Sequence, residues 1–544
     1  MIFSKFRRKL LAYLQKNFLY RVYKTKKNFY LIKNELDVRL NSDMHKVDNL
    51  NKKRILINLI ELNHYQFYRV LFLAEALRLR GADIKVLVCD STLQGCEIKS
   101  VRSGLDPCFT CRFNLKNVTP KFNVNFIKLS EYVTDIDLEN IRKDAKRILG
   151  NKKLITKESI DITGVVNDSV VRYFYGGQNA YTAKKIKSIK LDHIVSTMIG
   201  IHAANKIYSQ WRPHSILSNM GSYSAYSPYN IVAEKYSIKS NFISQSNYDK
   251  HKIILNAHEL FKGDSRYRKW SNHRNNAPLT EEESRELDGF ISARFSGKSN
   301  SFRENNYFSD KSFSDQFFID SKKTNIFLFP SIFWDAGISE WGGGLYSDVI
   351  EWVLDTVEAL KDNKDICLYI KPHPGESKTT DPSNMGVVDF IIEKFGSIPK
   401  NMTIITADME IKPYDLFPYI DIGLVFRGTL GLEMLLKNIP VISVGASPYS
   451  FLDSISCPSS RKEYMEMLLG NKELSKPDCD EVRLFSYFYF IKTLIPWTMT
   501  SEFMGGIFNF SFSSLKQIQS GENRYLDHLC DCILDPDLKS LENW

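Results

Sequence analysis

Short strand-like runs alternate with longer amphipathic segments along most of the chain, in two separate series. Short apolar runs bounded by turn residues are typical of buried strands, and the segments between them have helical spacing. The first series of strands is predicted at 53–60, 84–89, 215–220 and 241–245. The second is predicted at 325–330, 366–371, 402–406, 422–426 and 440–444. This alternation indicates parallel sheets that helices cover on both faces.

A chain of 544 residues is too long for one hydrophobic core, so we expect more than one domain. The predicted fold class is α/β, with two Rossmann-type doubly wound domains that face a cleft. The expected divisions are a basic N-terminal segment (1–50), a first α/β domain (51–248), a polar linker or insertion (249–323), a second α/β domain (324–450) and a helical C-terminal region (451–544). The C-terminal region is expected to brace both domains.

The N-terminal segment carries most of the net charge. Residues 1–33 contain ten Lys or Arg and no acidic residue, whereas the formal charge of the whole chain is +10, so the remainder is close to neutral. Its apolar residues recur at roughly helical spacing: Phe3, Phe6, Leu10, Leu11, Leu14, Phe18, Leu19 and Tyr20. A basic amphipathic helix suits an anionic membrane surface, where each Lys or Arg contributes about 1 kcal/mol. A solvated helix or a basic tail is the alternative.

Other features bear on the compartment and on the partners. No run of about 18 apolar residues is present, and the N-terminus lacks a secretory signal, so we expect a cytoplasmic protein, with peripheral binding to the inner face of the membrane through the basic segment. Nucleic acid is not an expected partner, because the folded part is nearly neutral and shows no recognition motif. Nine cysteines without a signal do not indicate a disulfide framework.

Two groups of residues raise the question of a metal. Cys89, Cys96, Cys108 and Cys111 cluster in the sequence and would suit structural zinc, with reduced thiols as the alternative. Asp135 and Asp137 form a D-x-D triplet, but such triplets are common by chance, and this one lies outside the domain with the phosphate-type loops described below. We therefore expect no obligatory metal and no resident cofactor.

The first candidate loop follows the predicted strand 366–371, in LYIKPHPGE (368–376). Ligands bind beyond the carboxyl ends of parallel strands, and prolines on both sides of His373 fix its backbone. A fixed imidazole can donate to a phosphate oxygen, with Lys371, Pro374 and Glu376 in the same loop. The alternative is a histidine that only caps a turn. Ser331 occupies the equivalent place after the strand 325–330.

The second candidate loop is Arg427-Gly428-Thr429, between the predicted strand 422–426 and a helix. Arginine suits bidentate phosphate contact, glycine allows close backbone approach, and threonine is expected to cap the helix. Glu433, four residues further, would accept hydrogen bonds from ribose hydroxyls. An ordinary capped helix with a solvated glutamate is the alternative. Two such loops predict a site for the phosphates of a nucleotide.

KPHPGE (371–376) and RGTLGLEMLLKNIPVISVG (427–445) resemble the bacterial capsule polysaccharide biosynthesis proteins, a family that includes Kdo-transferase-like GT-B glycosyltransferases. The pair of motifs also resembles that of bacterial sialyltransferases, which carry an HP motif and a Ser/Thr motif. The likeness covers about 320–450 and is weak in the first domain. It implies that His373 and Pro374 contact the phosphate of a CMP-sugar and that Thr429 supports this contact. The second motif has Arg-Gly-Thr instead of a run of serines, which leaves the donor open.

An inverting transfer needs a base near the acceptor hydroxyl. Glu61 and His64 follow the first strand of the first domain and are the candidates, and each is alternatively a loop residue without a catalytic part. Asp90 and Arg172 are further candidates for acceptor contact.

The sequence therefore predicts an inverting, metal-independent glycosyltransferase of capsule or surface polysaccharide synthesis. Its partners would be a nucleotide sugar and a polysaccharide or lipid-linked glycan acceptor. The alternatives are a sugar-nucleotide 2-epimerase, a CDP-polyol phosphotransferase and a non-catalytic polysaccharide assembly factor.

Overall fold

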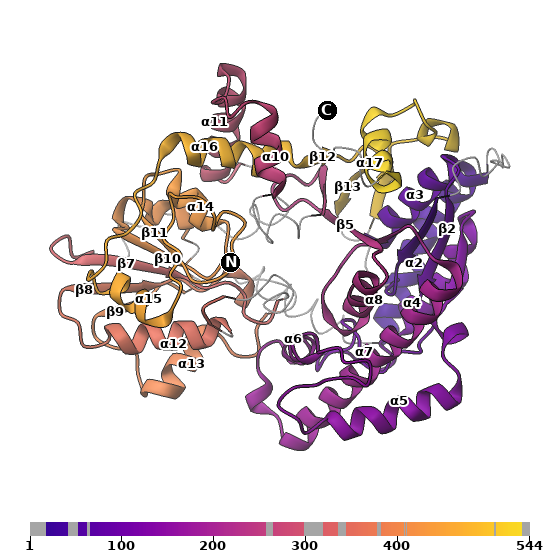
Figure 1. Ribbon diagram of the computed structural model, residues 1–544, viewed down its shortest axis with the longest axis horizontal. Helices are drawn as coiled ribbons and strands as arrows, with labels where there is room; N and C mark the ends of the chain where they lie inside the picture. Colours follow the sequence, from indigo (N-terminus) through magenta and orange to yellow (C-terminus); the bar gives the residue numbers. More distant parts are fainter. Residues whose placement is uncertain are drawn as a thin grey trace.

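The computed structural model describes residues 18–41, 53–62, 66–256, 265–298, 319–335, 344–346, 348–377, 382–406, 409, 411–504 and 507–535. Two open, mainly parallel sheets dominate it, each covered by helices on both faces (Figure 1). The α/β class and the two Rossmann-type domains expected from the sequence are confirmed. In Figure 1 the first sheet and its helices (indigo and purple) lie on the right, and the second sheet (salmon and orange) lies on the left.

The first sheet has the strand order β12-β6-β5-β4-β1-β2-β3. Its strands are β1 (Arg54–Asn58), β2 (Asp83–Val88), β3 (Asn125–Lys128), β4 (Ser215–Ser218), β5 (Lys239–Gln245), β6 (Lys252–Leu255) and β12 (Leu494–Pro496). The strands β3, β2, β1, β4 and β5 run parallel, and β6 and β12 are antiparallel to their neighbours. The chain continues from β1 to β2 on one side and returns to β4 on the other. The direction of winding therefore reverses between β1 and β4.

Alternating side chains of β1 pack into two different cores. Ile55 and Ile57 join the cluster that holds α3, α2 and α17, whereas Leu56 joins the cluster that holds α7 and α8. The helices of this domain are α2 (Phe18–Asn41), α3 (Gln66–Leu79), α4 (Phe109–Asn117), α5 (Asp135–Ile148), α6 (Thr163–Tyr173), α7 (Ala183–Trp211), α8 (Tyr223–Lys235) and α17 (Arg524–Leu534). Because successive strand residues point to opposite faces, one buried strand serves both layers.

The second sheet has the order β11-β10-β7-β8-β9, and all its strands are parallel. Its strands are β7 (Thr324–Phe329), β8 (Ile366–Ile370), β9 (Met402–Ile404), β10 (Ile422–Val425) and β11 (Val441–Ser443). Its helices are α12 (Val349–Leu360), α13 (Val387–Phe395) and α14 (Leu430–Leu435), with a 3₁₀ segment at Pro413–Tyr419. Phe327 faces the core beside α14, and Leu328 faces the core beside α12. Here the winding reverses between β7 and β10.

Two segments connect the sheets. The chain from α10 (Ser265–His273) to α11 (Glu281–Phe295) lies beside α16 (Cys479–Tyr487), and a π-helical turn (Phe488–Lys492) leads from α16 into β12 (Figure 1). The chain after α15 (Arg461–Leu468) therefore returns to the first domain. A helical tail alone was expected, but this region also forms β12 and the hairpin β13 (Thr500–Met504) and β14 (Ile507–Phe510). Strand β6 lies beyond the expected boundary at 248 and still belongs to the first sheet.

The described part of the basic N-terminal segment forms helix α2. Phe29, Leu36 and Leu40 of this helix are buried, and the ring of Phe29 packs edge-on against Phe113 of α4 at 5.5 Å. Leu19 remains exposed. Residues 1–17, which hold five of the ten basic residues, lie outside the described residues. Among the described helices, none is long and apolar enough to cross a membrane.

Candidate functional site

Three of the predicted loops leave the same edge of the second sheet. Strand β7 lies between β8 and β10, and all three run parallel, so the loops after them emerge side by side. These loops contain Lys371 after β8, Arg427 after β10 and Ser331 after β7. The carboxyl ends of parallel strands, at a point where the winding reverses, are the usual position for a ligand in such sheets. The topology thus brings together residues that lie about 100 positions apart in the sequence.

His373 is held in a fixed orientation by its own loop. Its Nδ1 accepts a hydrogen bond from the Gly375 N–H at 2.9 Å, at the start of the 3₁₀ turn Pro374–Glu376. A neutral imidazole with Nδ1 as acceptor carries its proton on Nε2, which makes Nε2 a donor. A Cβ on residue 375 would lie 2.4 Å from Cδ1 of Ile332, so a larger residue would require the Ile332 side chain to move. The loops after β7 and β8 therefore pack directly on each other.

The two charged neighbours of His373 are largely buried. Lys371 is 4% exposed, and its backbone N–H donates to the carbonyl of Leu328 at 3.0 Å, which extends the ladder between β7 and β8. The Glu376 Oε2 accepts from the Val387 N–H at 3.1 Å, at the first residue of α13. Burial raises the pKa of Glu376 to about 7. The carboxyl group that was expected to contact nucleotide thus holds the start of α13.

The Arg427-Gly428-Thr429 loop differs from expectation in two respects. Thr429 stands at the N-cap position of α14 but makes no capping hydrogen bond, so the expected cap is wrong. The Thr429 side chain instead lies close enough to the Tyr248 phenol to influence its pKa. A Cβ at Gly428 would meet no atom within 4 Å, so the protein does not itself require glycine there. The Gly428 carbonyl accepts a hydrogen bond from the Tyr449 hydroxyl at 2.5 Å, and this bond holds the loop in position.

Glu433 has a protein partner that the sequence did not indicate. Its Oε1 accepts from Arg294 Nε at 2.7 Å, and the Glu433 side chain is only 2% exposed. The guanidinium of Arg294 also lies 5.5 Å from the centre of the Tyr248 ring. A carboxylate that is buried against an arginine is not placed to accept from ribose hydroxyls, so this ion pair replaces the expected ribose contact. Loss of one partner of such a pair is strongly destabilising.

In the first domain, Glu61 follows β1 at the point where the winding reverses. Its carboxyl group is buried beside that of Glu97, and each carboxyl group influences the pKa of the other. Burial raises the pKa of Glu61, although the neighbouring Glu97 carboxyl group and the charge of Arg172 partly offset this rise. Burial and the negative charge of Glu61 raise the pKa of Glu97 well above its usual value. Two carboxyl groups in contact share a proton, because they cannot both ionise cheaply.

Two other expected residues of this domain contribute differently. His64 lies outside the described residues, so its predicted catalytic part stays a prediction. Asp90 accepts from Thr92 Oγ1 at 2.7 Å and from the backbone N–H of Ser130 at 3.3 Å. These contacts fix the loops after β2 and β3. Glu97, in contrast, was missed by the sequence reasoning, because an isolated glutamate between Cys96 and Ile98 belongs to no recognisable motif.

Arg172 connects the carboxyl pair to the second domain. Its guanidinium lies 4.8 Å from the centre of the Trp334 ring and 5.1 Å from that of Tyr175. Trp334 belongs to the loop that starts at Ser331, and its Nε1 donates to Ser383 Oγ at 2.7 Å. The Ser383 N–H in turn donates to the Glu376 carbonyl at 2.9 Å. A continuous set of contacts therefore leads from Glu61 to the loop of His373.

The same contact between domains is reinforced around Asn384. Its side-chain amide donates to the Phe174 carbonyl at 2.7 Å, and its Oδ1 accepts from Arg102 at 2.6 Å. A Cβ at Gly176, whose φ is +76°, would lie 2.1 Å from the Phe333 ring. Gly176 is thus required both by its backbone conformation and by the close approach of the second domain. This contact between the two domains holds the sheet edge that carries Glu61 and the sheet edge that carries His373 in a fixed relative position.

The possible metal ligands have other roles among the described residues. Asp137 caps α5 in a reciprocal arrangement with Thr134 and accepts from Lys206 at 3.0 Å. The Thr134 backbone N–H and Lys206 lower the pKa of Asp137. Burial raises the pKa of the Cys96 and Cys111 thiols well above the usual value, which favours the protonated form. Within the ranges that the structure describes, no three His, Cys, Asp or Glu side chains are grouped to hold a metal.

Comparisons with known proteins gave structural likeness only. No protein-family model matches the chain, and no curated protein matches it. The similar solved structures include KpsC of Thermosulfurimonas dismutans, titled a β-Kdo 2,4 transferase, at 12% identity and a TM-score of 0.32, covering 57% of this chain and 88% of KpsC. MurG of Acinetobacter baumannii is 12% identical with a TM-score of 0.25, covering 88% and 99% of the two chains.

A third similar structure is a putative UDP-N-acetylglucosamine 2-epimerase from Listeria monocytogenes. It is 10% identical with a TM-score of 0.23, and the match covers 80% of this chain and 94% of the epimerase. At TM-scores below 0.5, none of these likenesses supports a conclusion about the activity of this chain.

Proposed function

We propose that this chain is an inverting glycosyltransferase that moves a sugar from a nucleotide-activated donor to a glycan acceptor. The observation that carries the proposal is the placement of two chemical groups at facing sheet edges. Glu61 follows β1 and Glu97 follows β2, the His373 loop follows β8, and Arg172 and Trp334 join the two sites. One group suits removal of a proton, and the other suits an anionic leaving group.

In this reaction the acceptor hydroxyl attacks the anomeric carbon of the donor from the side opposite the leaving nucleotide. Its proton passes to the ionised carboxylate of Glu61. A carboxylate whose pKa is raised accepts that proton more readily than an ordinary glutamate. Glu97 holds the carboxylate in place through the shared proton, and Arg172 keeps part of the pair ionised.

The bond from the anomeric carbon to the phosphate oxygen breaks at the second domain. His373 Nε2–H donates to a phosphate oxygen as negative charge develops there, and Arg427 supplies a cation beside it. Thr429 adds a hydroxyl group to this site. The conformation of the His373 loop depends on Lys371, Pro374 and Glu376. Ser331 borders the donor. These groups neutralise the leaving phosphate without an obligatory metal or resident cofactor.

The finer identity follows from the sequence. The HP motif favours a CMP-linked acidic sugar as donor, and the basic residues 1–33 favour synthesis of a capsule or surface polysaccharide at an anionic membrane. The acceptor would then be a growing or lipid-linked glycan. A sugar-nucleotide 2-epimerase, a CDP-polyol phosphotransferase and a non-catalytic assembly factor are the outcomes that the following experiment separates.

The test begins with the melting temperature of the full chain in the presence of CMP-, UDP-, GDP- and CDP-linked compounds. A ligand present at 100 times its Kd stabilises the folded state by about 2.7 kcal/mol, which is readily seen. The best donor is then incubated with glycan acceptors and a strong chelator, and the product is weighed by mass spectrometry. Acceptor mass that grows by one sugar supports the proposal. An epimerised donor, transfer of a polyol phosphate, or no stabilisation by any compound would reject it.

A further inference from the structure

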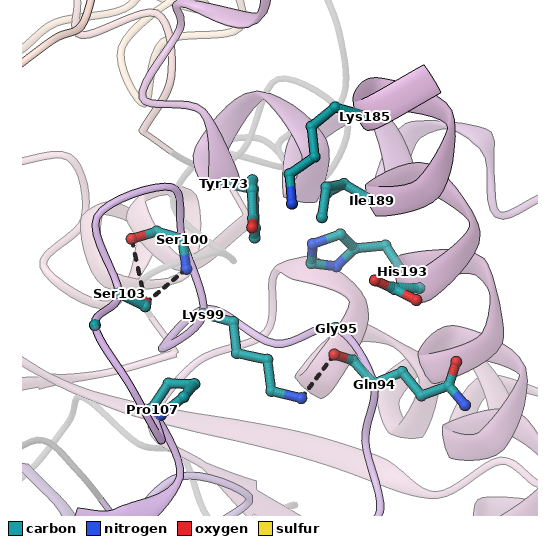
Figure 2. A pocket seen from close by; sticks show the side chains of 12 residues that line it. Gln94, Gly95, Lys99, Ser100, Ser103, Pro107, Tyr173, Lys185, Ile189 and His193 are labelled. Atoms are coloured by element: carbon teal, nitrogen blue, oxygen red, sulfur yellow. Dashed lines mark hydrogen bonds between the residues drawn. The ribbon is translucent and has the colours of Figure 1, made fainter. Parts of the chain in front are cut away.

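A polar cavity of about 270 Å³ lies in the first domain. It is formed by the loop 94–107, the last residue of α6 and the first turns of α7 (Figure 2). Its lining residues are Gln94, Gly95, Lys99, Ser100, Ser103, Gly104, Pro107, Tyr173, Lys185, Ile189, Asp192 and His193. Pockets for small ligands begin at about this size, so the cavity suits a single small molecule.

His193 is the most deeply buried polar group of the cavity, at 1% exposure. Its Nδ1 lies 2.6 Å from Ser224 Oγ, whereas its Nε2 has no hydrogen-bond partner among the described residues. Burial, and secondarily the charge of Lys99, lower the pKa of His193 to about 3, so the ring is neutral at physiological pH. A buried polar nitrogen without a partner is costly unless a bound molecule completes it.

The charges around the cavity do not cancel. Lys99 Nζ donates to the carbonyls of Leu93 and Gln94 at 2.9 and 2.7 Å, which leaves its third N–H for another acceptor. Lys185 brings a second ammonium group to within 5.9 Å of the Tyr173 ring centre. Asp192 is the one carboxylate in the lining, and Lys99 and Lys185 partly offset the rise of its pKa on burial. Because the lining carries two cations and one carboxylate, its net charge is positive, and one negative charge on a ligand would balance it.

The remaining surface combines an aromatic face with hydroxyl groups. Figure 2 shows Tyr173, Ile189 and Lys185 around the imidazole of His193, with Ser100 and Ser103 across the cavity. The Ser103 hydroxyl donates to the Ile98 carbonyl at 2.9 Å and accepts from the Ser100 N–H at 2.8 Å, so the opposite wall is held rigidly. A flat apolar ring beside several polar groups suits a ligand that is itself apolar on one face and hydroxylated at its rim.

We propose that this cavity binds one sugar ring that carries a single anionic group, either a carboxylate or a phosphate. The anion lies between Lys99 and Lys185, a ring hydroxyl completes the Nε2 of His193, Asp192 accepts from a second hydroxyl, and the sugar face lies on Tyr173. The site lies apart from the loops that follow β7, β8 and β10. Binding here does not depend on the transfer reaction proposed above.

Calorimetric titration of the full chain with glucuronate, glucose 6-phosphate, glucose and inorganic phosphate tests the inference. Saturable binding is expected for one or both sugar anions, and the pair of probes shows which anion the site takes. Glucose and inorganic phosphate should each bind at least about tenfold more weakly, because glucose lacks the anionic group and phosphate lacks the sugar ring. Lys185→Gln should weaken binding of the preferred sugar anion by about tenfold or more, the usual scale for loss of a charged hydrogen bond.

Lys184→Gln is the matched control, because residue 184 is exposed in the same turn of α7 and does not line the cavity. It should bind as the unaltered chain does. Asp192→Asn provides a second variant, with a loss of several-fold expected. The inference is overturned if neither sugar anion binds at millimolar concentration, if glucose binds as well as they do, or if Lys185→Gln and Asp192→Asn both bind normally. Binding of sugar anions without stabilisation by any nucleotide sugar would reject the transferase and keep this site.

Discussion

The guanidinium of Arg172 lies 4.8 Å from the centre of the Trp334 ring, although the two residues belong to different domains. The positive charge of Arg172 also lowers the pKa of Glu61 against the effect of burial. A single side chain thus contacts the second domain and influences the candidate base of the first. Separation of the two domains would remove Trp334 from Arg172 and change the surroundings of Glu61, so we expect the base to function only when the domains are in contact.

His373→Ala should lower kcat by roughly 10²–10³-fold with little effect on folding, the scale for loss of one donor to developing charge. His373→Asn separates catalysis from turn formation, because the asparagine oxygen can still accept from the Gly375 N–H but no group replaces Nε2–H. We expect both variants to be equally slow in a transfer assay with saturating donor. Wild-type turnover by the asparagine variant would show that His373 only caps its turn.

Arg427→Ala and Thr429→Ala should chiefly weaken nucleotide binding, because phosphate oxygens are present before and during transfer. We expect about tenfold or more for Arg427, since a hydrogen bond between charged groups is lost, and several-fold for Thr429. Isothermal titration with the bare nucleotide measures both. Lys400→Ala removes an exposed lysine from the same domain and should bind normally. If both loop variants keep full affinity, the donor lies elsewhere.

Glu376→Gln should stabilise the protein in a pH-dependent manner. The folded-state pKa of about 7 lies above the usual 4.5, so the folded state holds this proton more tightly than the unfolded state. That contribution is complete below pH 4.5 and is lost as the pH rises through 7. The neutral glutamine can still accept from the Val387 N–H. We expect equal stability at pH 4.5 and a gain of roughly 1–3 kcal/mol at pH 8.

Denaturant unfolding at the two pH values measures this gain. Glu393→Gln, at an exposed position of α13, is the control and should show no comparable change between them. A gain for Glu376→Gln that is the same at both pH values would mean that the carboxyl group is not buried in its protonated form.

Removal of residues 1–17 should release the protein from anionic vesicles. A deletion through residue 33 would also remove Phe29, which is buried against Phe113, and would damage the fold. The shorter deletion removes five basic residues and most of the apolar periodicity. Because the attraction is partly electrostatic, binding should weaken with added salt. Vesicle sedimentation checks this, and equal sedimentation of full-length and shortened chains would reject the membrane role.

The sequence predicted the strands well because each is a short apolar run bounded by glycine, proline or polar residues. The predicted strands 366–371 and 422–426 correspond to β8 and β10, within a residue at each end. Strand β12 was missed, since residues 494–496 are too few to show a period and are defined only by pairing with β6. The grouping of the loops after β7, β8 and β10 followed from the rule that parallel strands end at one edge.

Side-chain partners were less predictable, because they depend on contacts between distant segments. Arg294 pairs with Glu433 across 139 positions, from a region that the composition marked as a linker. Glu97 meets Glu61 only because β1 and the chain after β2 end close together. Neither pair has a sequence signature. The same applies to the cavity around His193, whose lysines look like ordinary surface residues in the sequence.

The most direct test of the account is the transfer rate of Glu61→Gln with the nucleotide sugar that stabilises the chain most. Glutamine keeps the size and the hydrogen-bonding capacity toward Glu97 but cannot accept a proton. We predict a decrease in kcat of roughly 10²–10⁴-fold, with donor affinity unchanged and with Glu131→Gln, an exposed control in the same domain, at full rate. A Glu61→Gln enzyme with the unaltered kcat would contradict the proposed reaction.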